Sequence, residues 1–487
     1  MSKFHIQQQY LRYRFIPHQQ LVVTFLIVLI SGCSFAPKYE RPNVDIALQY
    51  PQGDAYPKTY THPKNAENVL DIGWRAFFKD PLLQQLIEHA LANNHDLKIA
   101  ALNVAALEAQ YRIRRADLFP HLSTNADATV QKLPSDIAYN RRIYQLGLSS
   151  VAWELDLWGR LRNLNEQALQ NYLASDETRT AVHMSLVSAV ARAYMTLQAN
   201  HEQLSLTRAT VQAQQQSYEL TKALVKNGQA TQFDLSLAEM SLRAAQFDQS
   251  KMVRLVAQDR NALILLMGTP LSQSIALELD QAKDLSDRKL LSQISAGLPS
   301  DLLMRRPDIR AAEHMLLGAN ANIGVARAAF FPSIQLTGSV GVASSSLSDL
   351  FDSGTGMWNF IPKISLPIFN AGANRANLNH AQVLKRIEIV NYNKAIQTAF
   401  REVSDHLAGQ ATLDEQIKTQ QQSVNASEKA YQLAKLRFKA GQDNYFVVLD
   451  LERTLYAAQQ QLIQTRLEQL NNEIQLYKAL GGGWIRS

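Results

Sequence analysis

The chain repeats one pattern twice, first as Tyr218-Glu-Leu-Thr-Lys-Ala-Leu-Val-Lys-Asn-Gly228 and again as Tyr431-Gln-Leu-Ala-Lys-Leu-Arg-Phe-Lys-Ala-Gly441. The two copies are about 213 residues apart, and Leu266-Met267-Gly268 matches Ala479-Leu480-Gly481 at the same spacing. A duplication of this length predicts two copies of one structural unit, packed about a pseudo-symmetry axis.

Glycine and proline placement predicts two long helical hairpins. Between Arg160 and Met267 the only glycine is Gly228, and no proline occurs from 135 to 269 or after 367. These stretches are rich in Ala, Leu, Gln and Glu, which favour helix. From Leu186 to Val211, apolar and small residues recur at alternating steps of four and three, the a/d seam of a coiled coil. Each hairpin should turn at Gly228 or Gly441, where a residue that tolerates positive φ ends a helix.

The arms of the second hairpin are unequal. Its first arm, 374–440, would be roughly 100 Å long at 1.5 Å per residue, whereas the return arm, 442–480, is much shorter. Two other helical stretches, Pro81 to Leu118 and Ser300 to Ala329, precede the strand pairs. We therefore expect return arms to stack end to end on these shorter helices.

Four segments alternate apolar and polar residues in the manner of strands. They follow Pro120, cover Tyr144 to Leu157 more weakly, follow Pro332 and start at Met357. Segments of about ten residues with aromatic ends are typical of transmembrane strands, although a half-buried soluble sheet has the same period of two. Four strands cannot close a barrel, and an open edge in lipid leaves backbone groups unpaired. The strands should therefore come from several chains, eight from a dimer or twelve from a trimer, and a conducting helical tube favours the trimer.

The N-terminus predicts export and lipidation. Basic residues precede Leu21 to Ile30, an apolar run too short to span a bilayer. Ile30-Ser-Gly-Cys33 follows and resembles a lipobox, in which the cysteine is acylated after cleavage. Cys33 is the only cysteine, so a disulfide within the chain is impossible; the alternative is a spare cysteine after a signal anchor. Ser34 at the next position favours sorting to the outer membrane.

Composition and motifs argue against several other classes. The chain has 49 basic and 43 acidic residues, an imbalance too small and too evenly spread for a nucleic-acid-binding surface. His201-Glu202 lacks the second histidine of a zinc-protease motif, and Gly354-Thr-Gly356 lies in a strand loop rather than a nucleotide site. We expect no enzyme activity, no cofactor and no metal site.

Several motifs, in this order, resemble the TolC-type outer-membrane efflux family in its lipoprotein branch. They are Trp153-Glu-Leu-Asp-Leu-Trp-Gly-Arg160, Gly297-Leu-Pro-Ser-Asp-Leu-Leu-Met-Arg-Arg-Pro-Asp308, Ala319-Asn-Ala-Asn-Ile-Gly324, Ala328-Ala-Phe-Phe-Pro332 and Leu366-Pro-Ile-Phe369. The resemblance implies a mainly α fold with membrane β: a long α-helical coiled-coil barrel, plus four strands per chain in a 12-stranded homotrimeric β-barrel. It also implies partners, namely outer-membrane lipid, a periplasmic adaptor and an inner-membrane pump of the resistance-nodulation-division type. The duct itself would conduct drugs or other small solutes passively.

The resemblance also implies site residues. Family tunnels close at carboxylates six and nine positions after the second-repeat glycine, where this chain has Val447 and Asp450. Asp234, six positions after the first-repeat glycine, matches a family residue that latches neighbouring helices. Two alternatives remain open: Asp450 pairs with Arg453 or Arg437 on the helix surface, or Tyr445 or Phe446 forms an apolar plug. The adaptor-contact tips would be Lys226, Asn227, Gly228, Arg437, Lys439 and Gly441, although the basic residues among them also suit ordinary helix ends.

The expected organisation has six parts. They are a signal peptide (1–32), a lipidated extended strap (33–70), a first repeat (71–269) with strands at about 121–157, a linker (270–299), a second repeat (300–481) with strands at about 333–369, and a tail (482–487). The function expected is an efflux duct. Alternatives are a type I protein-secretion duct, a metal-efflux duct and a non-conducting structural lipoprotein of the periplasm.

Overall fold

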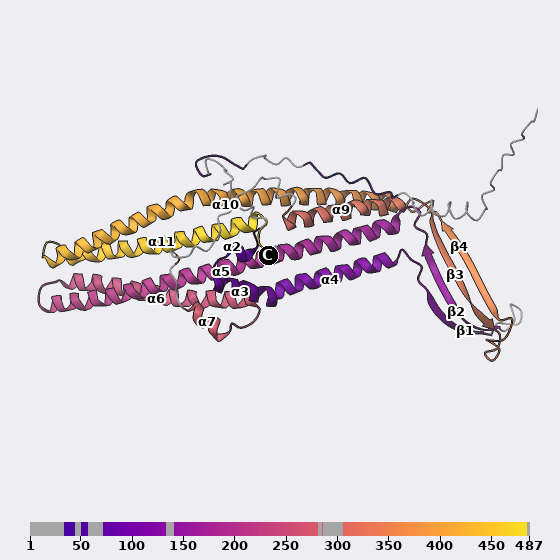
Figure 1. The fold of residues 1–487 in the computed structure, drawn as a ribbon, viewed down its shortest axis with the longest axis horizontal. Helices are drawn as coiled ribbons and strands as arrows, with labels where there is room; N and C mark the ends of the chain where they lie inside the picture. The colour runs from indigo at the N-terminus through magenta and orange to yellow at the C-terminus, as the bar shows by residue number, and fades with distance from the viewer. Residues whose placement is uncertain are drawn as a thin grey trace, which may run out of the picture. The chain divides into compact units, whose positions relative to one another are not determined.

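A computed structural model describes residues 34–43, 50–56, 72–132, 141–280, 285 and 305–484. These residues form long helices and one sheet (Figure 1). They divide into two compact units by contacts within the chain. The first unit contains the described residues of 34–41, 107–172 and 315–388, and the second contains the others. In the described part of the chain, no helix is long and apolar enough to cross a membrane.

The sheet of the first unit is an antiparallel meander in the order β1-β2-β3-β4 (Figure 1). Its strands are β1 (Ser123–Gln131), β2 (Arg141–Glu154), β3 (Ser333–Ser344) and β4 (Gly356–Ser365). The central pair, β2 and β3, joins one repeat to the other. Among the residues that the structure describes, β1 and β4 are the edges of this sheet, and each pairs along one side only.

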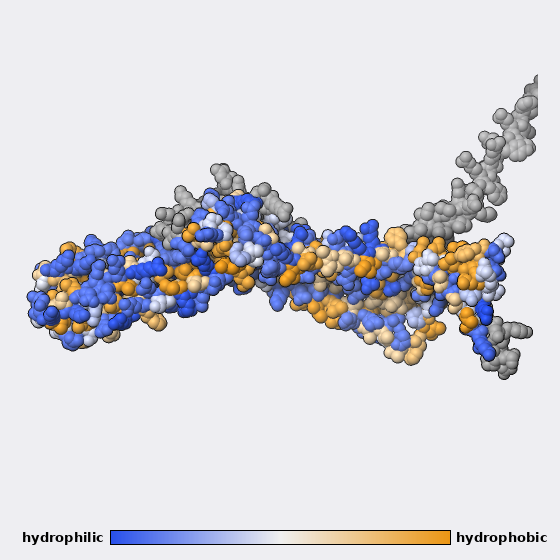
Figure 2. Space-filling view, turned by 90° about the horizontal axis from the view of Figure 1, so that it is seen from below, coloured by the Kyte–Doolittle hydropathy of each residue, from blue (hydrophilic) through white to orange (hydrophobic). Residues whose placement is uncertain are grey.

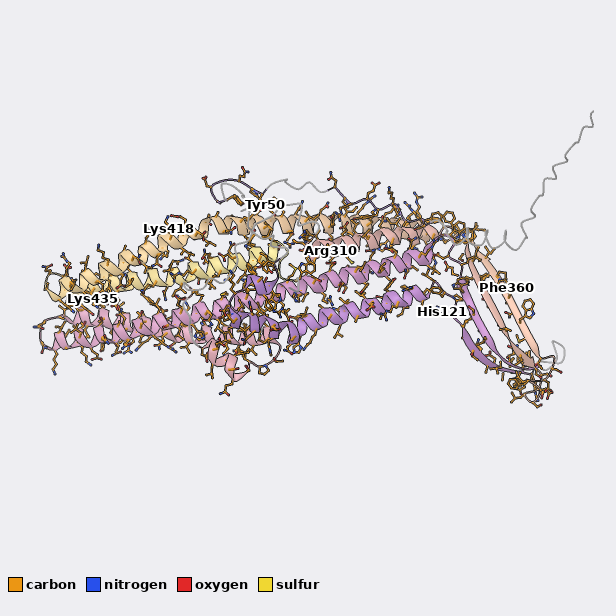
Figure 3. All side chains as sticks on the ribbon, in the orientation of Figure 1. Tyr50, His121, Arg310, Phe360, Lys418 and Lys435 are labelled. Carbon is orange, nitrogen blue, oxygen red and sulfur yellow. The ribbon has the colours of Figure 1, made fainter. Side chains whose placement is uncertain are left out.

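The two faces of the sheet differ as the alternation predicts. One row across the sheet, Ser123–Ser149–Ser339–Asn359, is polar throughout. Residues one position along point to the opposite face, where Leu148, Val340 and Trp358 stand in register and are 52%, 59% and 78% exposed. Phe360 projects from β4 on this face (Figure 3), and hydrophobic surface gathers over the strands (Figure 2). An exposed apolar face this extensive is suited to lipid or to another protein surface.

A β-bulge explains why β2 alternates weakly in sequence. The β2–β3 register shifts between Ser150 and Trp153. Ala152 adopts φ 54°, and its N–H donates to Thr337 Oγ1 over 3.0 Å. The extra residue moves the following side chains to the opposite parity, so Glu154 lies opposite Gln335 on the polar face.

The two expected hairpins are present. The first consists of α5 (Arg160–Lys226) and α6 (Gln232–Met267), and the second of α10 (Ala373–Lys439) and α11 (Tyr445–Ala479). The long arms, α5 and α10, have 67 residues each, and the return arms have 36 and 35. The other helices of the described residues are α2 (Trp74–Phe77), α3 (Pro81–Asn93), α4 (His95–Ala116), α7 (Gln273–Leu279) and α9 (Pro307–Ala328).

The helical stretch expected from Pro81 to Leu118 is not continuous, because Asn94 interrupts it. Asn94 has an extended ψ of 132°, and its side-chain oxygen accepts from Leu97 N, which makes it the N-cap of α4. Its Nδ2 donates to Leu266 O at the end of α6, over 3.0 Å. The break therefore provides the joint at which the return arm α6 meets the shorter helices.

The second repeat has the equivalent joint, built from a different side chain. Arg306, immediately before α9, donates from Nη1 to Ala479 O at the end of α11, over 2.9 Å. The guanidinium also pairs with Asp308 and Glu402 at 2.7 and 2.9 Å, and its side chain is only 8% exposed. Both return arms thus end against a shorter helix, as their lengths predict.

The core of the second unit is aromatic and aliphatic. The rings of Phe77 and Tyr477 stack at 3.8 Å, and the Tyr477 hydroxyl donates to Ile72 O. Leu186, Val190 and Leu197 of the expected a/d seam are buried there. Such burial stabilises a long helix mainly by tertiary contact, because isolated helical propensity is weak.

Candidate functional site

Both hairpins end in the same glycine-centred motif. After α5, Gly228 has φ 70°, its N–H donates to Val225 O, and Gln229 N donates to Leu224 O. These two bonds define a Schellman motif, in which a residue at positive φ satisfies the last carbonyls of a helix.

The turn after α10 repeats this geometry. Gly441 has φ 72°, its N–H donates to Phe438 O, and Gln442 N donates to Arg437 O. A Cβ at either glycine would meet no atom within 4 Å, so positive φ, rather than lack of space, requires glycine there.

The return helices begin differently in the two repeats. Thr231 and Asp234 form a capping box at the start of α6: Thr231 Oγ1 accepts from Asp234 N, and Asp234 Oδ2 accepts from Thr231 N and Oγ1. The hydroxyl bond, together with the backbone bond, lowers the pKa of Asp234. At the start of α11, Asn444 makes no side-chain cap bond. Within one chain, then, the carboxylate of Asp234 serves its own helix.

The carboxylates near Gly441 are paired with arginines. Asp450 accepts from Arg453 Nη2 over 2.6 Å, as the surface-pair alternative predicts for Arg453. Arg437 instead binds Asp443 through two bonds of 2.6 and 3.0 Å. This hydrogen bonding lowers the pKa of Asp443 and raises that of Arg437. The Asp450 side chain is still 43% exposed, so its carboxylate remains accessible from outside the chain.

The two aromatic candidates beside Val447 have different surroundings. The hydroxyl of Tyr445 hydrogen-bonds to the Ser217 hydroxyl of α5, and its ring packs on Phe438 at 4.8 Å. Phe446 is 49% exposed. Of the two, Phe446 is therefore the one whose ring faces away from its own chain.

Buried ionisable groups escaped the sequence analysis. Burial raises the pKa of Glu473 to about 7, and the charge of Asp414 adds to the effect. Burial raises the pKa of Glu452 to about 6, and Lys435, near the hairpin end in Figure 3, partly opposes the shift. Both lie on α11 among its apolar positions, and that placement in a helical pattern is the signal that could have identified them.

Arg306 was missed in a different way. The stretch Arg305-Arg-Pro-Asp308, taken alone, predicts only a helix start at Asp308. The structure adds a buried hydrogen bond from Arg306 to the end of α11. Alignment of the two repeats places Arg306 opposite Asn94, and both donate to the last turn of a return arm.

Among the described residues, no three His, Cys, Asp or Glu side chains gather where they could hold a metal ion. Cys33 lies outside the described residues.

A sheet with an exposed apolar face and two unpaired edges, in a chain with two very long helical hairpins, defines a channel-forming subunit. The family model described as "Outer membrane efflux protein" matches residues 86–269 and 298–482, one match in each repeat. The chain belongs to this family. Its class is the outer-membrane channel component of an efflux pump, and its location is the outer membrane.

Named relatives agree with this assignment. The chain is 46% identical to the probable efflux pump outer membrane protein TtgC of Pseudomonas putida over 95% of both chains. It is 41% identical to the cation efflux system protein CusC of Escherichia coli, covering 95% of this chain and 98% of CusC. The open-state structure of the MtrE outer membrane channel of Neisseria gonorrhoeae matches with a TM-score of 0.85 and 38% identity, over 93% of this chain and 99% of MtrE.

Proposed function

We propose that this chain forms, as a homotrimer, the exit duct of a tripartite efflux pump, and that it conducts small solutes without acting as an enzyme. The observation that carries the trimer is the pair of free edges, β1 and β4, in a sheet whose apolar face is exposed. Unpaired edge groups are costly in lipid. Because β1 and β4 run in opposite directions, β4 of one copy can continue the antiparallel pattern into β1 of the next. Three copies would close a twelve-stranded barrel.

Exposed apolar residues on two helices support association with other copies of the chain. On α4, Ile99, Leu102 and Ile113 are 55%, 69% and 63% exposed. On α6, Phe233 and Met240 are separated by seven residues and are 69% and 66% exposed. Stripes of this spacing lie on one helix face and are suited to a helix of a neighbouring copy.

Cysteine crosslinking tests the trimer. One cysteine on β1 and one on β4, scanned along the strands in a Cys33→Ala background, should give a ladder that ends at three chains. The interface joins different edges, so the ladder counts the copies in the ring. A ladder that ends at two chains, or that continues beyond three, would overturn the proposal.

The proposed cargo is drugs or other small organic solutes, delivered by a resistance-nodulation-division pump through a periplasmic adaptor. The toluene efflux pump outer membrane protein TtgC of Pseudomonas putida, at 46% identity, is a more similar relative than CusC, at 41% identity, which belongs to a cation efflux system. Expressed with the adaptor and pump of its own operon in a host lacking outer-membrane factors, the chain should lower accumulation of a lipophilic dye. Reduced silver or copper accumulation with unchanged dye accumulation would favour the metal-efflux alternative instead.

The hairpin tips are the proposed adaptor contacts, with Lys226, Asn227 and Gly228 in one and Arg437, Lys439 and Gly441 in the other. Both tips expose a basic residue next to a glycine turn of the same geometry. A photoreactive residue at Lys226 or Lys439 should crosslink to the adaptor in cells. Crosslinks obtained only from residues near the sheet would reverse the proposed orientation.

Asp450 is the proposed gate carboxylate, with Asp234 as a latch between neighbouring helices. Three converging Asp450 carboxylates would attract cations to the mouth and repel one another. In planar bilayers, Asp450→Ala should lower cation selectivity and weaken block by multivalent cations. Asp443→Ala is the control, because it removes another arginine-paired carboxylate near the same tip. Wild-type selectivity in Asp450→Ala would show that this residue does not line the constriction.

Acylation of Cys33 is the proposed membrane anchor, at the junction of signal peptide (1–32) and strap (33–70). The support is the lipobox-like Ile30-Ser-Gly-Cys33. Metabolic labelling with palmitate should mark the wild type and spare Cys33→Ala. Equal labelling of both proteins would exclude acylation at this residue.

A further inference from the structure

The segment that follows Cys33 is held on the first unit by an aromatic contact. The Phe35 ring stacks on Phe331 at 4.6 Å and lies parallel to Trp158 at 6.1 Å. Trp158 is itself fixed, because its Nε1 donates to Pro332 O over 2.7 Å. Trp158 lies two residues before the start of α5 in the first repeat, and Phe331 follows α9 in the second, so Phe35 contacts both repeats.

Polar side chains of α9 bind the same segment. Arg327 Nη1 donates to Phe35 O over 3.0 Å, and Asn320 Nδ2 donates to Pro37 O over 2.8 Å. Recognition of alternate carbonyls together with one anchored ring is typical of sites that bind extended peptides.

Two further bonds involve Asn163 and Asn320 of this surface. Asn163 Oδ1 accepts from the Ser34 hydroxyl over 3.0 Å. Lys385 Nζ donates to Asn320 Oδ1 over 2.8 Å, which orients the amide that binds Pro37. Asn163 and Asn320 are each only 5% exposed. Pro37 is therefore bound by an amide that Lys385 orients, and Ser34 is bound by a buried amide.

Gly324 provides the space that the segment needs. A Cβ at this position would come within 2.8 Å of Ala36 N and would also clash with the Asn163 amide. Glycine inside a helix is destabilising relative to alanine. Close approach of the Ala36 backbone is a physical reason for glycine at this position of α9.

We propose that Trp158, Asn163, Asn320, Gly324, Arg327 and Phe331 form a recognition site, the strap site, for the Ser-Phe-Ala-Pro segment at residues 34–37. The strap site fixes the position of whatever membrane anchor Cys33 carries. Only this consequence depends on the proposed acylation, because the strap site binds residues 34–37 through their own atoms.

The strap site limits the reach of the anchor. Consecutive Cα atoms are about 3.8 Å apart, so a lipid on Cys33 is tethered directly beside Ser34. A free coil as long as the 33–70 stretch would let its end range over roughly 30 Å. The strap site removes this freedom. It holds Ser34, the residue next to the anchor, beside the start of α5, which follows β2, and the end of α9, which precedes β3.

Trypsin cleavage after Lys38 tests the strap site in the full-length protein in membranes. Lys38 is exposed, but cleavage requires residues around it to leave the surface. Gly324→Ala should accelerate this cleavage by at least about tenfold. Gly318→Ala is the matched control on the same helix, because a Cβ there meets atoms only at 3.4 Å and beyond. Equal rates in the wild type, Gly324→Ala and Gly318→Ala would overturn the proposal.

A second variant separates loss of the strap site from misfolding. Phe35→Ala changes only the bound segment, and it should accelerate cleavage after Lys38 while hydrogen exchange in α9 and α5 stays at wild-type rates. Wild-type protection of Lys38 in Phe35→Ala would also overturn the proposal. Cys33→Ala should keep Lys38 protected. The two proposals can thus be refuted separately. Equal palmitate labelling would contradict acylation of Cys33, and unchanged cleavage after Lys38 in the variants would contradict the strap site.

Discussion

Glu473 should make the protein less stable as pH rises towards neutrality. Its side chain lies on α11 near Asp414 of α10, and burial is the main cause of its raised pKa of about 7, against an ordinary value of 4.5. The folded state therefore binds a proton that the unfolded state releases between these two pH values. The stabilising contribution is fully present below about pH 4.5 and is lost as pH rises through 7.

The size of the effect follows from the shift. At 1.36 kcal/mol per pKa unit, the difference between 4.5 and 7 corresponds to about 3 kcal/mol of unfolding free energy. Glu473→Gln keeps the shape of the side chain and removes its charge. At pH 8 the variant should be more stable than the wild type by up to about 3 kcal/mol, and at pH 4.5 the two should be equally stable.

Denaturant unfolding in detergent at pH 4.5, 6 and 8 measures this difference. Glu468→Gln is the control, because it removes a carboxylate of the same kind from an exposed position on the same helix. Subtraction of the wild-type curve also removes the contribution of Glu452, which titrates at about 6. A Glu473→Gln difference that is the same at all three pH values would refute the role assigned to burial.

Three further predictions concern stability; the first and third are measured by thermal or denaturant unfolding, and the second by the amount of folded protein in the outer membrane. Arg306→Ala should cost about 1–3 kcal/mol because it leaves the buried Ala479 carbonyl without its donor, whereas Arg401→Ala, which breaks an exposed i,i+4 pair, should cost under about 0.5 kcal/mol; equal costs would refute the helix joint. Gly341→Ala places a Cβ 2.5 Å from the Cα of its cross-strand neighbour and should deplete folded protein from the outer membrane, while Gly356→Ala, with open space, should not; normal amounts of both would show that the sheet yields there. Thr231→Ala should cost about 1 kcal/mol by removing the capping box, and an unchanged midpoint would show that the cap adds nothing.

Local signals in the sequence predict the hairpins well, because glycine at positive φ and absence of proline act within a few residues. The alternation predicts both sheet faces for the same reason. The weak pattern of β2 has a local cause as well, since the bulge at Ala152 changes the parity of the strand. The break at Asn94 was missed although its cap bond to Leu97 N is local, and its bond to Leu266 O of α6 depends on the fold.

Contacts between distant segments were not predictable in this way. Nothing near Arg306 in sequence indicates that the carbonyl of Ala479 lies within reach of its guanidinium. Likewise, Phe35 appears as one aromatic residue in a proline-rich stretch, and only the fold brings Trp158 and Phe331 to it. Both cases depend on pairs far apart in the chain, which composition and periodicity do not encode.

The β2–β3 ladder has a consequence for how such a chain can arise. It joins the strand pair β1–β2 of the first repeat to the strand pair β3–β4 of the second, edge to edge and antiparallel. The free edges β1 and β4 offer the same kind of contact to another molecule. One repeat alone is thus a two-stranded module with both edges unpaired. In a ring of such modules, gene duplication turns half of the contacts between molecules into permanent contacts within one chain. The two halves are then free to diverge, as the replacement of Asn94 by Arg306 at the equivalent joints illustrates.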